Sequence, residues 1–312
     1  MKHSICILAL ALLPWSAAAV DNPDWAYPVA PPSAERPDNT VGKQMPGSAK
    51  TYTQAQIDDG FNPPDWYPDE HPPLPRVVAN GAPPSVRACI LCHLPSGSGH
   101  PESSSVAGLP VPYILRQWAA FKNGGRKGIR ATNMIAFAQA ISDEDLRVSA
   151  DYFSALKPAK WIRVVETDTV PLSRVGPGTT MRFAVAEGGM EPIGNRVIEL
   201  PEDAARARSR DPHSGFVAHV PLGSVAKGEA LVTTGSSGKT IPCAICHGAA
   251  LKGLGEVPSI VGRSPMYVYR QLNDMQNGNR TGSLVELMKA VVAQLSHDDM
   301  VALAAYLASR DP

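Results

Sequence analysis

Two short segments constrain this chain more than any other feature of its sequence. Each has two cysteines separated by two residues, with a histidine directly after the second cysteine. Two thiols one helical turn apart can reach the two vinyl groups of one porphyrin, and the adjacent imidazole can bind its iron. The spacing therefore predicts two covalently attached c-type haems. Their attachment residues would be Cys89, Cys92, His93, Cys243, Cys246 and His247.

Other uses of paired cysteines fit this sequence less well. Four cysteines in an exported chain can form disulfides, but here both pairs precede a histidine. A redox-active pair needs a thioredoxin-like context, which neither flank provides. A structural zinc site needs four ligands, and each cluster offers three. Haem attachment is the interpretation that uses every residue of both segments.

The first residues of the chain indicate export. Lys2 and His3 precede an apolar run from Ile5 to Leu13, and small residues follow at 16–19. This pattern predicts a cleaved signal peptide over residues 1–19 and a mature protein in the periplasm. A retained anchor is the alternative, but the run is far shorter than the roughly 20 residues that span a bilayer.

Charge excludes two classes of partner. The chain has 29 basic and 29 acidic residues, so its formal net charge is zero. Broad electrostatic binding to nucleic acid or to an anionic membrane is therefore not expected.

The chain contains an internal repeat. Shifting the sequence by 154 residues superimposes the two cysteine motifs and, without a gap, many other residues. Such register over so long a stretch indicates a duplication. The matched pairs are Gly81 and Gly235, Gly108 and Gly262, Tyr113 and Tyr267, Gln117 and Gln271, Gly124 and Gly278, Arg126 and Arg280, Met134 and Met288, Ser142 and Ser296, Asp145 and Asp299, Ala150 and Ala304, and Tyr152 and Tyr306.

The two copies share helix signals. One helix is predicted from Pro112 to Gly124 and its counterpart from Pro265 to Gly278, with proline at the start and glycine at the end. Another helix begins at Ser142-x-x-Asp145 and at Ser296-x-x-Asp299, a capping-box pattern. Before the second cysteine motif, residues 225–232 read as a short helix containing a glycine.

On these residues each copy resembles a class I cytochrome c domain, and the tandem pair resembles diheme carriers of the cytochrome c4 type. The resemblance covers residues 76–158 and 223–312. It implies a mainly α fold with two tandem domains. It also implies that Met134 and Met288 are the distal iron ligands, and that Gly228 lets the first helix cross close beneath Tyr306.

Histidine is the main rival for the distal position. The candidates have no histidine partner at the repeat offset, and the sixth ligand cannot be a thiolate because no mature cysteine is spare. A thioether raises the reduction potential and closes the sixth coordination position, which suits an electron carrier better than an enzyme. The rival histidines are His71, His100, His213, His219 and His297.

Two matched pairs of residues have open roles. Arg126 and Arg280 either pair with haem propionates, to which guanidinium groups are suited, or lie solvated in turns. Tyr152 and Tyr306 are predicted to pack between helices, and a part in redox chemistry is the alternative.

Two segments lie outside the repeat. Residues 20–75 are rich in proline, which favours an extended arm that covers the first domain; a docking element for a redox partner is the alternative. Residues 159–222 are predicted to be a long linker with short strands near 161–165, 181–185 and 196–200 and a short helix within 201–210. The predicted division is a signal peptide at 1–19, a Pro-rich arm at 20–75, cytochrome domains at 76–158 and 223–312, and a linker at 159–222.

The predicted function is one-electron transfer in the periplasm, with no catalytic residues. The expected donor is a dehydrogenase or a quinol-oxidising complex, and the expected acceptor is an oxidase or another cytochrome. One alternative is a cytochrome subunit of a periplasmic dehydrogenase complex. The other is a diheme peroxidase, which would need an open or switchable haem with acid–base residues beside it.

Overall fold

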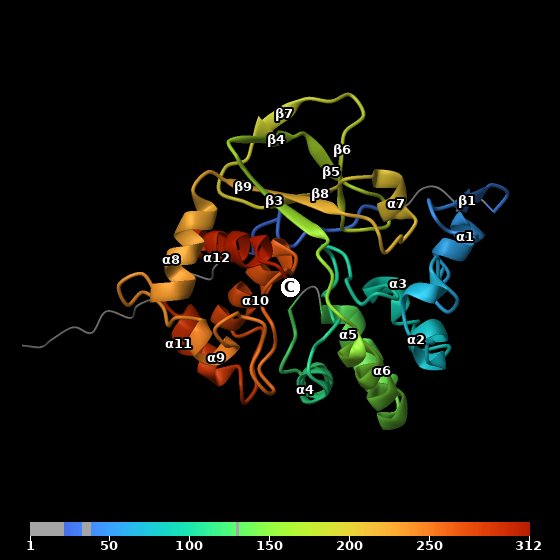
Figure 1. The fold of residues 1–312 in the computed structure, drawn as a ribbon, viewed down its shortest axis with the longest axis horizontal. Helices are drawn as coiled ribbons and strands as arrows, with labels where there is room; N and C mark the ends of the chain where they lie inside the picture. Colours follow the sequence, from blue (N-terminus) through green and yellow to red (C-terminus); the bar gives the residue numbers. More distant parts are fainter. Residues whose placement is uncertain (1–21, 33–38, 129–130) are drawn as a thin grey trace, which may run out of the picture.

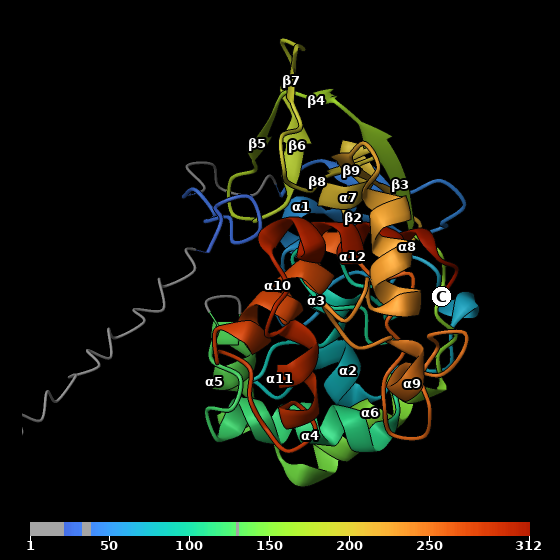
Figure 2. The same ribbon diagram turned by 90° about the vertical axis from the view of Figure 1, so that its left-hand side faces the viewer.

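The computed structural model describes residues 22–32, 39–128 and 131–312 (Figure 1). The predicted signal peptide at 1–19 lies outside the described residues. Figures 1 and 2 show the helices of the two repeats side by side beneath a layer of β-strands. We call residues 76–158 the first repeat, 223–312 the second repeat, 20–75 the arm and 159–222 the insert.

The helices of the two repeats follow the same register. The first repeat contains α2 (Arg76–Asn80), α3 (Ile90–His93), α4 (Val111–Lys122), α5 (Thr132–Ala140) and α6 (Asp143–Ala155). The second contains α8 (Ser224–Thr234), α9 (Ala244–His247), α10 (Pro265–Gln276), α11 (Glu286–Val292) and α12 (His297–Ser309). The bounds of α3, α4 and α6, shifted by the repeat offset, are those of α9, α10 and α12. The duplication predicted from the sequence is therefore present in the fold.

Repeated glycines occupy repeated backbone conformations. Gly81 and Gly235 have φ of 65° and 70°, and Gly108 and Gly262 have φ of 68° and 66°. These values lie in the left-handed region, which side chains with a Cβ rarely adopt. The turns that they form hold the attachment segments in the same relation to the helices in both repeats.

Helix α8 crosses closely over α12. A Cβ atom at Gly228 would overlap the carbonyl oxygen of Ala302 and would lie 2.7 Å from the Cβ of Tyr306. The predicted close crossing is confirmed. Tyr152 and Tyr306 are both buried, as expected for residues that pack between helices.

The insert carries more structure than the sequence predicted. Its elements are β3 (Ile162–Thr167), β4 (Thr169–Pro171), β5 (Ser173–Val175), β6 (Arg182–Ala184), β7 (Met190–Pro192), β8 (Ile198–Pro201), α7 (Ala204–Arg208) and β9 (Phe216–Pro221). The predictions of β3, β6, β8 and α7 are confirmed. Strand β9, which was missed, lies between β3 and β8, parallel to the first and antiparallel to the second.

The insert also shares hydrophobic cores with the second repeat. Val170, Ile198 and Val220 belong to the same buried cluster as the side chains of α12. Phe216 and Ala308, at the end of α12, meet in a further cluster. A segment predicted as a linker is thus packed against the second repeat along its strands.

The arm contains short elements and touches both repeats. It has β1 (Gly42–Gln44), β2 (Thr51–Thr53), α1 (Gln54–Ile57) and η1 (Pro68–Glu70). Its later part lies over the first repeat, where the backbone N–H of Ala88 donates to the carbonyl of Gly60. Its earlier part lies in the second repeat, where Tyr27 donates to Asp274 at 2.9 Å. The arm therefore contacts the second repeat in addition to the first domain that it was predicted to cover.

Within the described residues, no helix combines the length and the hydropathy that crossing a membrane requires.

Candidate haem sites

Helix α3 presents the first candidate iron ligand. Cys89 caps this short helix and His93 ends it. The Nδ1 of His93 lies 2.9 Å from the carbonyl oxygen of Ser104. Because a carbonyl only accepts hydrogen bonds, the proton of the neutral ring belongs on Nδ1, which leaves Nε2 available for a metal.

Helix α9 repeats this arrangement. The Nδ1 of His247 lies 2.8 Å from the carbonyl oxygen of Pro258. Ser104 and Pro258 occupy matched positions of the repeat. Burial lowers the pKa of both His93 and His247, so both rings are neutral at neutral pH, as metal binding requires.

Among the described residues, the four cysteines of the motifs form no disulfide bonds. Burial raises the pKa of Cys89 and of Cys243 to about 11. Cys246, in contrast, is exposed.

A cavity of about 570 Å³ joins the candidate residues of the first repeat. Cys89, Cys92, His93 and Met134 all line it, so the structure brings the predicted distal ligand and the proximal histidine to one space. Aromatic side chains complete the wall; they are Tyr113, Trp118, Phe121, Phe137, Phe153 and, from the second repeat, Tyr267. The volume and the apolar lining suit a large flat cofactor.

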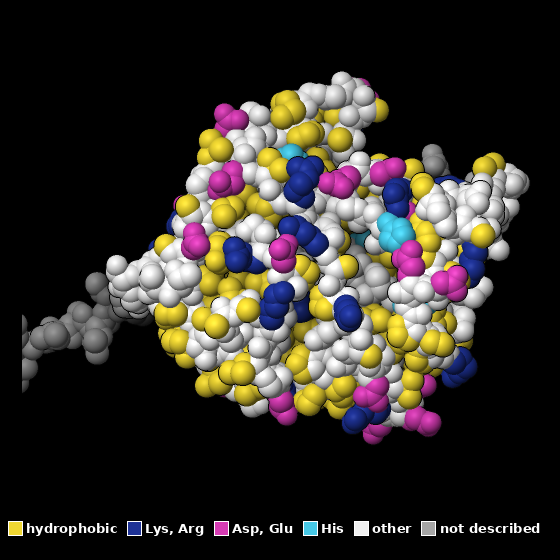
Figure 3. Space-filling view, in the orientation of Figure 1, with side chains coloured by type: hydrophobic (Ala, Val, Ile, Leu, Met, Phe, Trp, Pro, Cys, Tyr) yellow, Lys and Arg dark blue, Asp and Glu magenta, His cyan; other side chains and the backbone are white. Residues whose placement is uncertain are grey.

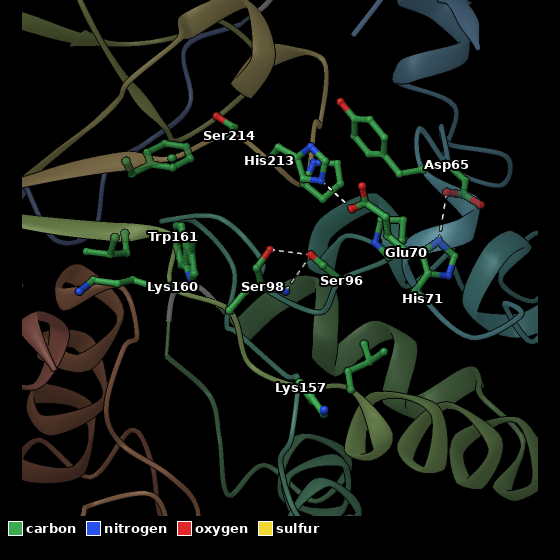
Figure 4. A pocket seen from close by; sticks show the side chains of 18 of the residues that line it. Asp65, Glu70, His71, Ser96, Ser98, Lys157, Lys160, Trp161, His213 and Ser214 are labelled. Atoms are coloured by element: carbon green, nitrogen blue, oxygen red, sulfur yellow. Dashed lines mark hydrogen bonds and ion pairs between the residues drawn. The ribbon is translucent and has the colours of Figure 1, made fainter. Parts of the chain in front are cut away.

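Of the residues that the structure describes, none of the five rival histidines lines this cavity. His71 and His213 line a different cavity of about 860 Å³ (Figure 4), where they pair with Asp65 at 3.1 Å and with Glu70 at 2.6 Å. Met134 is the candidate that remains for the sixth position of the first repeat.

In the second repeat, Cys243 and Met288 both pack against the core that contains α12. Met288 lies in α11, the counterpart of α5, which carries Met134. The two methionines therefore occupy equivalent places.

Several known proteins are similar to this chain, although no family model matches it. The thiosulfate dehydrogenase electron acceptor of Thiomonas intermedia is 27% identical over 234 residues, which are 73% of this chain and 81% of that protein. Cytochrome c4 of Pseudomonas aeruginosa is 24% identical over 224 residues, or 70% of this chain and 82% of that protein. Cytochrome c-554(548) of Halomonas halodenitrificans is 34% identical over 71 residues, or 22% of this chain and 86% of that protein.

The chain belongs to the c-type cytochromes.

The likeness to cytochrome c4 confirms the predicted diheme, class I type of this cytochrome, which has two covalent haems and transfers electrons. Its relatives are cytochromes and electron acceptors, and nothing supports a diheme peroxidase. A solved thiosulfate dehydrogenase from Marichromatium purpuratum shares the fold, with a TM-score of 0.51 and 23% identity. That match covers 75% of the cytochrome and 39% of the solved chain.

The two repeats of the cytochrome meet at a cluster of matched polar residues. Arg126 donates to Gln117 at 3.1 Å and to Gln271 at 2.9 Å. Arg280 donates to the same two glutamines and to the hydroxyl of Tyr113 at 2.9 Å. The backbones of the two arginines also pair as an isolated β-bridge.

This cluster fits the acidic edge of a haem. Arg280 is buried, and its Nε has no hydrogen-bond partner among the described residues. The partners of both guanidinium groups given above are neutral, so their positive charge suits propionate carboxylates. The alternative that these arginines are solvated turn residues is wrong for Arg280 and does not suit Arg126, which is half-buried.

Sequence analysis missed one carboxylate in the wall of the first cavity. Glu102 accepts from the hydroxyls of Thr179 and Thr180 at 2.8 and 3.0 Å and from the Thr180 N–H at 2.9 Å. Burial alone would raise the pKa of Glu102, but the nearby His100 and these donors hold it below its usual range.

The repeat itself contained the signal for this carboxylate. Glu102 matches Glu256, and Arg116 matches Arg270 at the same offset. Arg116 pairs with Glu256 across the contact between repeats, and Arg270 donates to the carbonyl of Pro101, beside Glu102, at 2.8 Å. These matched positions therefore form contacts between the two repeats.

Proposed function

We propose that each haem is held by two thioethers and by one histidine and one methionine ligand. In the first repeat these are Cys89, Cys92, His93 and Met134. In the second they are Cys243, Cys246, His247 and Met288. The observation that carries this proposal is the imidazole geometry, in which Nδ1 of both histidines faces a carbonyl at matched residues and Nε2 is left for iron.

The bound haem supplies a one-electron couple. The side chains of this chain set the conditions under which that couple works. His93 and His247 are fixed in tautomer and orientation by backbone carbonyls. Met134 and Met288, as thioether ligands, would exclude substrates from the iron and favour its reduced state. The arginine cluster between the repeats supplies positive charge in the wall of the first cavity, which Arg126 and Arg280 both line.

We further propose that the cytochrome accepts electrons from a dehydrogenase that oxidises a small inorganic sulfur compound. Support comes from two relatives, a thiosulfate dehydrogenase electron acceptor and the cytochrome subunit of sulfide dehydrogenase from Chlorobaculum tepidum. The pattern of residues 1–19 supports export to the periplasm, with an oxidase or another cytochrome as the acceptor.

Single substitutions test the ligands. Met134→His and Met288→His replace a thioether by a stronger donor, so each should lower the midpoint potential of one haem and leave the other unchanged. Spectra of the oxidised holoprotein should lose half of the methionine–iron charge-transfer band in each variant. Met190→His is the control, because Met190 is exposed on β7. An intact band in either ligand variant would show that the methionine is not bound to iron.

The donor is tested by mixing the oxidised holoprotein with purified thiosulfate dehydrogenase and thiosulfate. Growth of the α-band of the reduced haems would support this donor if its rate depends on the concentrations of both thiosulfate dehydrogenase and thiosulfate. Reduction by neither thiosulfate dehydrogenase nor sulfide dehydrogenase with its substrate would rule out the sulfur-compound proposal and leave the haem ligands unaffected.

A further inference from the structure

The two attachment segments differ in exposure although their sequences and helices match. Leu91 is 4% exposed, whereas Ile245 at the matched position is 66% exposed. His100 is 1% exposed, whereas its counterpart Leu254 is 62% exposed. We call residues 88–100 the first attachment face and 242–254 the second. The same surface of the fold is covered in one repeat and open in the other.

The arm and the insert together cover the first attachment face. Arg210, at the end of α7, donates to the carbonyl of Leu91 at 2.7 Å and to that of Ile57 at 3.1 Å. The ring of Phe216 in β9 lies 6.3 Å from that of His100. Figure 1 shows α3 enclosed by α1 and α2 on one side and α7 above.

The arm and the insert, which together form this cover, also contact each other. The indole of Trp66, which is fully buried, donates to the carbonyl of Ser209 at 2.9 Å. The ring of Tyr67 stacks on that of His213 at 4.0 Å, and His213 pairs with Glu70. Figure 4 shows this pair at the seam between the two segments. The cover is therefore a packed part of the molecule.

The second attachment face is open and apolar. Helix α9 lies at the periphery in both views of the ribbon (Figures 1 and 2). Figure 3 shows hydrophobic side chains gathered over this part of the molecule. The exposed apolar residues on and beside the face are Ile241, Ile245, Leu254, Leu284 and Leu287.

Charged groups beside this face are paired within the chain. Lys289 pairs with Glu286 at 2.7 Å, and Glu256 pairs with Arg116 of the first repeat. Lys252, within the face, donates to the carbonyl oxygen of Pro312 at 2.8 Å and keeps its positive charge. A partner that docks here consequently meets an apolar surface with one positive charge, so its own docking surface has to be apolar and carry few charges.

We propose that the second attachment face is the single port through which protein partners exchange electrons with both haems. The occupant is a one-electron redox protein with an apolar surface of few charges around its own redox centre. The first repeat supports this assignment, because there the equivalent face is already buried against protein. This inference rests on the proposed function, since it requires a haem behind each face.

Electron balance is simple in this arrangement. Two partner molecules each lose one electron at the second face, and the cytochrome gains two. The first of these electrons moves on to the first repeat across the contact at Arg126 and Arg280, where the two backbones pair. The second repeat is then oxidised again and ready for the next partner.

Ile245→Glu tests the port, with Leu222→Glu as the matched control. Leu222 is also 66% exposed but lies in the turn between β9 and α8. In stopped-flow experiments, a reduced single-haem cytochrome c is the protein probe and hydroquinone is the small neutral probe. A charge buried in the contact should slow the reduction of both haems by the protein probe about tenfold. The rate of reduction by hydroquinone, and all rates of the control variant, should stay within about twofold of the wild-type values.

Three outcomes would overturn the proposal. Slowing of only half of the absorbance change would mean that the first haem has its own port. Unchanged rates in Ile245→Glu would mean that the second face is not used. Equal slowing by Leu222→Glu would mean that the effect is not specific to the face.

A second readout does not depend on electron transfer. In proton NMR of the oxidised holoprotein, a soluble gadolinium chelate should broaden the haem methyl signals of the second repeat and spare those of the first. Arg210→Ala, which removes a clamp of the cover, should make the first set sensitive. Equal broadening of both sets in the wild type would overturn the proposal. A haem count of two per chain, measured beforehand, separates these results from a failure of the proposed function.

Discussion

At the scale of single residues, each haem site rests on a small number of backbone contacts. The carbonyls of Ser104 and Pro258 fix the orientation of His93 and His247. Each carbonyl comes eleven residues after its histidine in the sequence, and the loop between them brings the two groups into contact. The candidate ligands could be named from the sequence because cysteine, histidine and methionine repeat in register, and their binding to iron stays a prediction. The role of Arg280 could not, because its burial depends on a contact between repeats that no local pattern encodes.

Asp299 gives a prediction at this scale. Burial alone would raise its pKa, but Lys239, the Ser296 hydroxyl and N–H, and Lys227 at 3.0 Å hold it far below the usual range. A carboxyl group whose pKa is depressed in the folded state stabilises the fold at pH values above its pKa in the unfolded chain. This stabilisation is lost as the pH falls below about 4.

Asp299→Asn should therefore lower the free energy of unfolding at pH 7 by roughly 2 kcal/mol and flatten its fall below pH 4. Urea titrations of the holoprotein at several pH values measure both effects. Asp145→Asn is the control, because Asp145 occupies the matched position in α6 but has no lysine partner among the described residues. Equal losses in the two variants would contradict the ion-pair explanation.

At the scale of elements, the repeat helices could be predicted and the insert only in part. Prolines, capping serines and glycines are local signals, and they mark α4, α6, α10 and α12 within a residue or two. Strand β9 pairs with β3 across more than fifty residues, and no local signal specifies such a pairing. The anchoring of Tyr27 in the second repeat is likewise a long-range contact.

The crossing of α8 and α12 gives a prediction at this scale. Gly228→Ala would push a methyl group into the backbone of Ala302, so the helices must separate. The free energy of unfolding should fall by about 1–3 kcal/mol in urea titration. Glu229→Ala, on the exposed side of the same helix, should leave stability nearly unchanged. An equally stable Gly228→Ala variant would show that the crossing tolerates a larger separation.

At the scale of the whole molecule, the arm and the insert bind the two repeats together. Trp25 and Tyr27 lie in the core of the second repeat, whereas Trp66 and Tyr67 lie over the first. Residues of the insert belong to the core around α12 and also clamp the first attachment face. Neither repeat is complete without segments from outside it.

The holoprotein should accordingly unfold in one cooperative transition. Far-ultraviolet circular dichroism and the Soret absorbance, followed in the same urea titration, should give the same midpoint. Two separated transitions would mean that the repeats are stable independently. That result would contradict the expectation that the shared cores make them unfold together.

The central claim is that the chain binds two low-spin haems, each with one histidine and one methionine ligand. Proton NMR of the fully reduced holoprotein tests it most directly, because a methionine methyl bound over a haem is shifted strongly to high field. The account predicts two such three-proton signals, one lost in Met134→His and the other in Met288→His. A spectrum with one signal or none would contradict it.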